Sequence, residues 1–143
     1  MKSVNKKEIK KTLTRIEKGT KNLYSVWVLL ICCYIDALGK EIYRNNNSKC
    51  RFKQFIFDRM AVTYKELEEK SEKDGKHKEH YLDLLYSDIR CGLVHEYFPK
   101  SKTKVIYSKG SCIVDISVKF PNCDLVINAR RFREDFLAAL NKL

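Results

Sequence analysis

Apolar residues recur every three or four positions along the N-terminal part of the chain, which is the spacing of amphipathic helices. A narrow apolar face within a lysine-rich segment predicts a first helix that ends near Gly19. Residues 21–43 carry a wider apolar face, which predicts a central helix buried on most sides. The apolar positions of these two segments are Ile9, Leu13, Ile16, Tyr24, Trp27, Val28, Ile31, Tyr34, Ile35, Leu38 and Ile42.

Two more helices are predicted after the turn signal in residues 45–48. The apolar period continues through residues 52–67 and predicts a single helix there, the third of the chain, which is followed by a charged helix end and loop to residue 78. A fourth helix, residues 82–98, ends at Pro99, because proline cannot continue a helix. Residues 1–98 are therefore expected to form a four-helix up-and-down bundle. The seam of the fourth helix consists of Leu82, Leu85, Ile89 and Leu93.

After Pro99 the hydrophobic period changes from helical to extended. Residues 105–107 and 112–118 flank Lys109-Gly110 and predict a small antiparallel hairpin, with a third short strand at residues 125–127. A closing helix is predicted over residues 129–142, where Phe132, Phe136 and Leu140 repeat every four positions. Residues 1–143 are thus expected to form a single domain, with the bundle in 1–98 and an extension in 99–143.

Composition favours a polyanionic partner. The chain has 29 Lys and Arg against 18 Asp and Glu, which gives a formal net charge of +11. Such an excess favours nucleic acid through counterion release, although lysine-rich proteins without that role also exist. The longest apolar stretch, residues 26–35, is shorter than the roughly 18 residues that span a bilayer. No signal-peptide pattern is found, so a cytoplasmic protein without membrane contact is expected.

The six cysteines do not form a disulfide or zinc pattern. Cys32 and Cys33 are adjacent within an apolar helical stretch, and no C-x-x-C spacing occurs. A reduced intracellular protein is therefore expected, with this cysteine pair in the core. Sequence motifs for NTP hydrolysis, dinucleotide binding, hydrolase-fold esterolysis and zinc proteolysis are also missing, and no cofactor is expected.

Candidate chemistry centres on residues 90–95. Arg90 and His95 place a permanent cation and a titratable imidazole five positions apart near the end of the fourth helix. Arginine presents a planar set of donors matched to phosphate oxygens, and histidine exchanges protons near neutral pH. Both residues therefore suit work on a phosphodiester. Asp36, Asp88 and Cys91 are predicted to support them, and Tyr97, Lys100 and Lys102 to contact RNA.

Arg90, four intervening residues and His95, at the end of a fourth helix, resemble the R-x4-H motif of the HEPN superfamily. Many members of that superfamily are metal-independent endoribonucleases. The resemblance covers roughly residues 5–98, and its one departure is Cys91, where these ribonucleases often carry a polar residue. It implies RNA cleavage to a 2′,3′-cyclic phosphate and a 5′-hydroxyl, in a defence or toxin–antitoxin setting with a possible antitoxin partner.

Helical geometry separates the two motif residues. Arg90 and His95 lie about 140° apart on a straight α-helix, so they cannot share one face. Either the helix bends at Gly92 or a second subunit completes the site. The resemblance favours the second route, because HEPN proteins commonly dimerise so that two motifs meet across a two-fold axis. A symmetric homodimer with the fourth helices near that axis is therefore expected.

Each candidate residue also has a structural interpretation. In that interpretation Arg90 serves only as an ion-pair partner of Asp36, Asp83 or Asp88, and His95 only as a helix cap. Tyr97 and Phe98 either stack on a base or close the core. The pair Cys91 and His95, with His77 and His80, could in principle ligate zinc, but the spacing matches no zinc signature and no metal is expected.

Three hypotheses about function therefore remain open. The leading hypothesis is a dimeric RNA endonuclease in which His95 is the general acid or base and Arg90 stabilises charge on the phosphate. The alternative is a catalytically silent HEPN-like module that binds nucleic acid, nucleotide or a protein partner. A basic helical interaction protein unrelated to HEPN is a third possibility.

Overall fold

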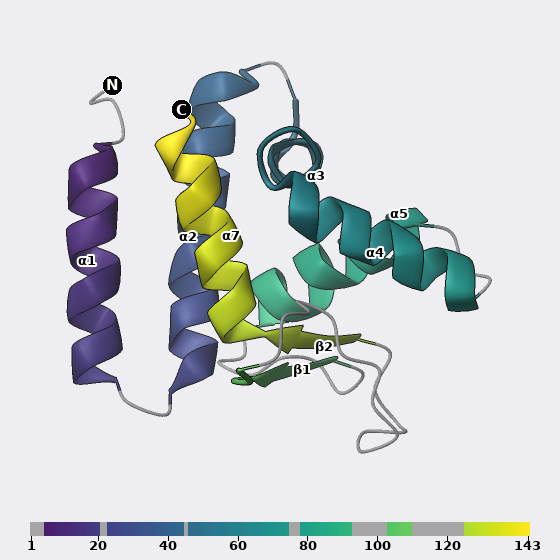
Figure 1. Cartoon of the computed structure of the whole chain (residues 1–143). Coiled ribbons are helices and arrows are strands. Elements are labelled where there is room, and N and C mark those ends of the chain that lie inside the picture. The colour runs from purple at the N-terminus through teal and green to yellow at the C-terminus, as the bar shows by residue number, and fades with distance from the viewer. Residues whose placement is uncertain (1–4, 21–22, 45, 75–77, 93–102, 110–124) are drawn as a thin grey trace.

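The computed structural model describes residues 5–20, 23–44, 46–74, 78–92, 103–109 and 125–143, and it is mainly helical (Figure 1). Within these residues α1 to α5 precede residue 98, and both strands and then α7 follow it, so the predicted order of element types is confirmed. The elements are α1 (Lys6–Gly19), α2 (Tyr24–Ile42), α3 (Ser48–Arg59), α4 (Ala61–Asp74), α5 (Lys78–Leu84), the π-helical segment η1 (Leu85–Cys91), β1 (Thr103–Ile106), β2 (Leu125–Asn128) and α7 (Ala129–Asn141).

Asparagine side chains begin three of the helices. Asn5 caps α1, Asn47 caps α3 and Asn128 caps α7, and each side-chain oxygen accepts a backbone N–H hydrogen bond from the first turn. Such a cap satisfies a donor that has no partner inside the helix. The predicted end of the first helix at Gly19 and the predicted start of the last at Ala129 are both confirmed.

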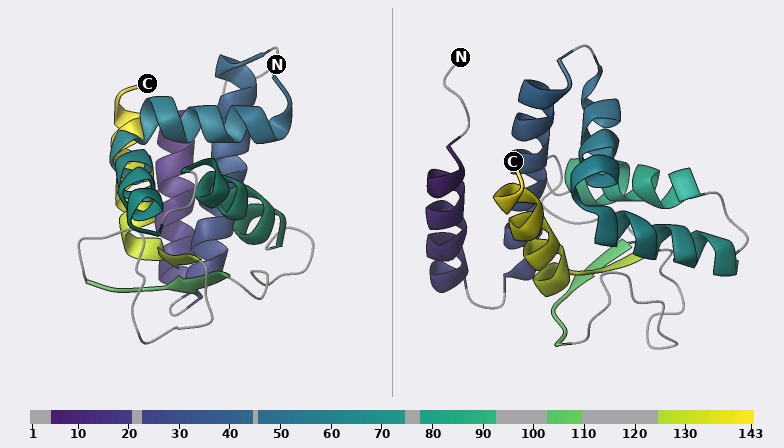
Figure 2. Two further views of the ribbon diagram at one scale, coloured as in Figure 1. Left: turned by 90° about the vertical axis from the view of Figure 1, so that its right-hand side faces the viewer. Right: turned by 45° about the horizontal axis from the view of Figure 1, so that its top comes forward.

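The central helix α2 organises the core. It contacts α1, α3, α7, β1 and η1, and none of the described helices is both long and apolar enough to cross a bilayer. The helices α1, α2 and α7 run alongside one another, and α4 crosses their direction (Figure 1, Figure 2). The helix predicted as a C-terminal extension therefore contributes to the same core as the N-terminal helices. Its buried residues include Phe132, Phe136 and Leu140.

The single third helix predicted over residues 52–67 is wrong, because the chain breaks at Met60 into α3 and α4. Met60 has φ −109° and ψ 56°, outside the helical region, yet its side chain is 2% exposed. It donates a backbone hydrogen bond to Ile56 and accepts one from Tyr64. Since an apolar residue occupies the bend, the hydrophobic period continues across it and no glycine or proline marks the change.

The predicted antiparallel strand element is also wrong, since β1 and β2 pair in parallel with Thr103 opposite Leu125 and Ile106 opposite Asn128. A parallel pair requires a crossover connection rather than a tight turn. The predicted strand at residues 112–118 and the turn at Gly110 lie outside the described residues, whereas the predicted strand at residues 125–127 is confirmed as β2. Alternation predicts an extended chain but does not fix the direction in which it pairs.

Aromatic rings attach the chain after β1 to the start of α2. The rings of Tyr24 and Tyr107 stack with centroids 4.6 Å apart, and Trp27 packs edge-on against both. The Trp27 indole N–H also donates to Thr20 Oγ1 at 3.1 Å. These contacts hold the chain after β1 against the start of α2, and η1 also contacts both α2 and β1.

Candidate functional site

Arg90 lies near the end of η1, which has π-helical hydrogen bonding over residues Leu85–Cys91. Single π-helical turns are rare and often occur at functional sites. On an α-helix Arg90 would lie about 140° from Leu85, whereas i to i+5 bonding widens the turn and reduces that angle. Leu85 and Ile89 are fully buried, and η1 packs against α2. The π-helical turn therefore directs Arg90 toward α2.

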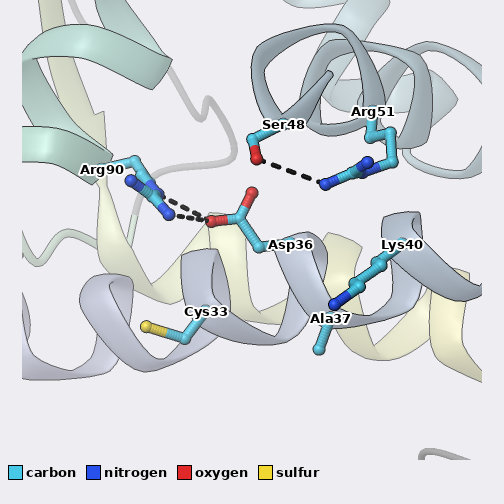
Figure 3. A pocket seen from close by; sticks show the side chains of 7 residues that line it. All are labelled: Cys33, Asp36, Ala37, Lys40, Ser48, Arg51 and Arg90. Carbon is cyan, nitrogen blue, oxygen red and sulfur yellow. Dashed lines mark hydrogen bonds and ion pairs between the residues drawn. The ribbon is translucent and has the colours of Figure 1, made fainter. Parts of the chain in front are cut away.

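Asp36 of α2 holds Arg90 in place (Figure 3). The Arg90 Nε and Nη2 atoms each lie 2.6 Å from Asp36 Oδ2, and the two side chains are 22% and 19% exposed. Arg90 Nη1 contacts Cys91 Sγ at 3.6 Å, and its Cζ lies 5.3 Å from the centre of the Tyr86 ring. Burial lowers the pKa of Arg90, but the contacts with Cys91 and Asp36 outweigh it and raise that pKa above its usual value. Arg90 is therefore a permanent cation.

The other carboxylate oxygen of Asp36 has no such contact. Asp36 Oδ1 is buried and lacks a hydrogen-bond partner among the described residues. In Figure 3 it points toward Ser48 at the start of α3 (Figure 3). A buried acceptor without a hydrogen-bond partner lowers the stability of the fold by about 1–3 kcal/mol. A hydrogen bond to this oxygen from a donor that can reach it would therefore be favourable.

A pocket of about 410 Å³ opens beside this ion pair. Arg51 of α3 is held at its wall by donating from Nη2 to Ser48 Oγ at 3.2 Å and from Nη1 to the backbone carbonyl of Asn46. Three cationic side chains line the pocket against one carboxylate, that of Asp36, so its walls are positively charged. The lining residues are Cys33, Asp36, Ala37, Lys40, Ser48, Arg51 and Arg90.

Cysteine side chains around the pocket are free thiols. Cys32 is buried and Cys91 is half-buried, but Cys33 is exposed at the pocket wall, so the prediction that both adjacent cysteines lie in the core is wrong for Cys33. Burial, with Asp36 adding to it, raises the pKa of Cys33, although Arg90 acts in the opposite direction. Burial also raises the pKa of Cys32. Because thiolates are the nucleophiles, neither thiol is suited to nucleophilic chemistry at neutral pH.

The structure brings together three of the residues named for the site, namely Arg90, Asp36 and Cys91. Asp88 does not contact Arg90 and instead accepts a hydrogen bond from Ser87 Oγ at 2.9 Å. Asp83, the third acid considered as an Arg90 partner, binds the α3 lysines instead. The predicted residues His95, Tyr97, Lys100 and Lys102 lie outside the described residues.

Sequence reasoning missed the rest of the pocket. Lys40 follows Asp36 by four positions on α2, and that helical spacing was the one available signal for its place. Ser48 and Arg51 reach the pocket only because the α2–α3 turn folds the start of α3 against α2. No local pattern shows that approach, because the contact joins residues of two different helices.

Neither metal-ligating groups nor related proteins identify the chemistry of this pocket. In the part of the chain that the structure describes, no group of three or more His, Cys, Asp or Glu side chains is placed to hold a metal ion. The side chains of His77, His80 and His95, considered above for zinc, are not among those described. No protein-family model, curated protein or solved structure matches the chain.

Proposed function

We propose that this chain is a metal-independent RNA endonuclease of the HEPN type, in which Arg90 and His95 act on the phosphodiester. The observation that carries the proposal is the arrangement of Arg90, fixed by Asp36 at the wall of a positively charged pocket. A cation in a fixed orientation stabilises charge that develops on a phosphate without reorganising during the reaction. The helical core is proposed to correspond to the HEPN bundle.

Arg90 retains donors for a substrate. Its guanidinium carries five N–H groups, and those of Nε and one of Nη2 face Asp36 Oδ2. A third, on Nη1, faces Cys91 Sγ in a weak contact. One N–H on each terminal nitrogen is left for phosphate oxygens, which arginine binds through charge-assisted hydrogen bonds.

The proposed reaction uses the RNA itself as nucleophile. The 2′-oxygen attacks the adjacent phosphorus and the bond from phosphorus to the 5′-oxygen breaks, which gives a 2′,3′-cyclic phosphate and a 5′-hydroxyl. His95 acts either as the base that takes the 2′-hydroxyl proton or as the acid that protonates the departing 5′-oxygen, with water completing the other transfer. Arg90 binds the phosphate oxygens that gain negative charge.

A nuclease assay on mixed RNA tests this proposal with two variants. Cleavage is expected to persist in EDTA, because the chemistry uses a cation and a proton carrier of the protein. Arg90→Lys keeps the charge and one bond to Asp36 but loses the fork, so cleavage should fall by about 100-fold or more while folding is retained. His95→Ala should lose activity to a similar degree. The control is Lys65→Ala on α4, an exposed residue outside the pocket, which should cleave normally.

The alternative function is a catalytically silent HEPN-like module that binds nucleic acid, nucleotide or protein. One observation favours it, since Asp36 already engages two nitrogens of Arg90, as a purely structural ion pair would. Cleavage that requires a divalent metal, or full activity of the His95→Ala variant, would contradict the endonuclease and favour this module.

A further inference from the structure

Two cations of the pocket have no carboxylate partner among the described residues. Lys40 is exposed at the end of α2, and Arg51 donates only to the neutral acceptors Ser48 Oγ and the Asn46 carbonyl. Neighbouring lysines behave differently, because Lys49 and Lys53 both lie within 3.1 Å of Asp83 Oδ1. Lys49 and Lys53 therefore share one carboxylate on the Asp83 side of α3, whereas Arg51 has none among the described residues on the pocket side.

The single carboxylate of the pocket cannot neutralise both. Asp36 is committed to Arg90 through its Oδ2 atom, so that pair adds no net charge to the pocket. Lys40 of α2 and Arg51 of α3 then leave two unmatched positive charges around the pocket. Like charges that line one pocket repel, and an anion bound between them offsets that repulsion.

We infer that Lys40 and Arg51 form a second phosphate site, which holds a backbone phosphate of the RNA next to the one that Arg90 contacts. This inference rests on the proposed function, since it takes RNA as the ligand. A phosphate offers several acceptor oxygens, enough for the Lys40 ammonium, the Arg51 guanidinium and the Ser48 hydroxyl proton together. The volume of about 410 Å³ lies within the range of ligand pockets and leaves room for the attached sugar.

A polynucleotide fits these features better than a free phosphate ion does. Arg90 and the pair of Lys40 and Arg51 lie on separate elements around one pocket, which provides two cationic positions (Figure 3). Successive phosphates of one strand supply two linked anions for those positions. The second site would then position the strand without touching the bond that is cut, so its loss should weaken binding rather than the chemical step.

RNA binding tests the second site in the full chain carrying His95→Ala, which prevents cleavage under the proposed mechanism. Fluorescence anisotropy of a labelled single-stranded RNA is measured with and without Lys40→Ala, over a range of salt concentrations. Lys40→Ala should weaken binding about 3- to 10-fold and lower the slope of log affinity against log salt by about 0.7, the value for one phosphate contact in single strands. Lys40 is exposed, so its replacement should leave the fold intact.

Lys65→Ala is the matched control, because it removes the same charge from an exposed position outside the pocket. Equal effects of the two substitutions on affinity and slope would overturn the second site. So would an effect of Lys40→Ala on binding of inorganic phosphate alone with RNA affinity unchanged, since that result would assign the pocket to a small phosphate ligand.

Failure of this inference can be told apart from failure of the proposed function. If the chain does not cleave RNA but Lys40→Ala still weakens RNA binding selectively, the nuclease proposal fails and the second site stands. If the wild-type chain cleaves RNA and Lys40→Ala leaves KM unchanged, the second site fails and the nuclease stands. A chain that neither binds nor cleaves RNA contradicts both.

Discussion

At the scale of single residues, the Arg90 guanidinium pairs with Asp36 and is also proposed to bind a phosphate of the ligand. Asp36 binds it through one oxygen, and both side chains are about four-fifths buried. Pairs in this environment differ from surface ion pairs, because removing one partner leaves a desolvated charge behind. The effect of a substitution at Arg90 therefore combines lost ligand binding with lost stability, and the two have to be separated.

A double-mutant cycle between Asp36 and Arg90 separates them. Arg90→Met should lower the free energy of unfolding by about 2–3 kcal/mol, between the values for exposed and fully buried pairs, because it leaves the Asp36 carboxylate without its partner. Asp36→Asn should cost less, and the two together should cost at least about 1 kcal/mol less than their sum. Urea unfolding followed by circular dichroism measures all three. Additive losses would show that the two side chains do not stabilise each other.

Sequence reasoning named Asp36 as one of three acids that could pair with Arg90, beside Asp83 and Asp88, and the structure selects Asp36. The surroundings of the pair were not predicted. Lys40 and Arg51 could not be assigned to the same pocket, because their approach depends on how closely α3 packs on α2. That distance is set by side-chain packing between helices, which periodicity does not encode.

At the scale of elements, two features of the helices escaped the sequence pattern for a shared reason. The bend at Met60 and the π-helical turn of η1 both keep apolar residues on the buried face. Hydrophobic spacing of three to four positions is compatible with a continuous α-helix, a broken one or one with a single wider turn. The pattern therefore predicts that a segment is helical more reliably than it predicts where the helix bends or changes its hydrogen-bonding pattern.

The close packing of α2 on α3 gives a prediction about glycines. A Cβ atom at Gly39 would lie 3.2 Å from the backbone oxygen of Arg51 and 3.3 Å from its Cβ, whereas nothing lies within 4 Å of one at Gly19. Gly39→Ala should lower the free energy of unfolding by about 1 kcal/mol, because displacing α3 costs more than the gain in helix propensity. Gly19→Ala, the control at the end of α1, should be neutral or stabilising by up to about 1 kcal/mol.

Thermal or urea unfolding of the two glycine variants checks this prediction. A stabilising effect of Gly39→Ala equal to that of Gly19→Ala would mean that α3 moves away at little cost. The α2–α3 contact would then be too loose to hold Arg51 at the pocket wall, which makes the same measurement informative for the second phosphate site.

At the scale of the whole molecule, the site is expected to need two chains. Arg90 is fixed by Asp36 of its own chain, so its position does not depend on a partner. His95 follows it by five positions, and on an α-helical continuation that spacing turns the two side chains about 140° apart. A two-fold axis near the ends of these segments would bring Arg90 of one subunit to His95 of the other. The high net charge of +11 makes such a contact unfavourable unless apolar residues outside the motif hold the dimer.

Mixed dimers test this arrangement. A chain with Arg90→Lys keeps His95, and a chain with His95→Ala keeps Arg90, so a dimer of the two rebuilds one complete site if the residues act across the interface. Random pairing makes half of the dimers mixed with one working site of two, which predicts about one quarter of the wild-type activity. If each subunit works alone, the mixture should be as inactive as its parts. Sedimentation of the wild-type chain supplies the second test. A strictly monomeric protein that cleaves RNA would exclude the composite site. The π-helical turn or a bend at Gly92 would then have to bring Arg90 and His95 together within one chain.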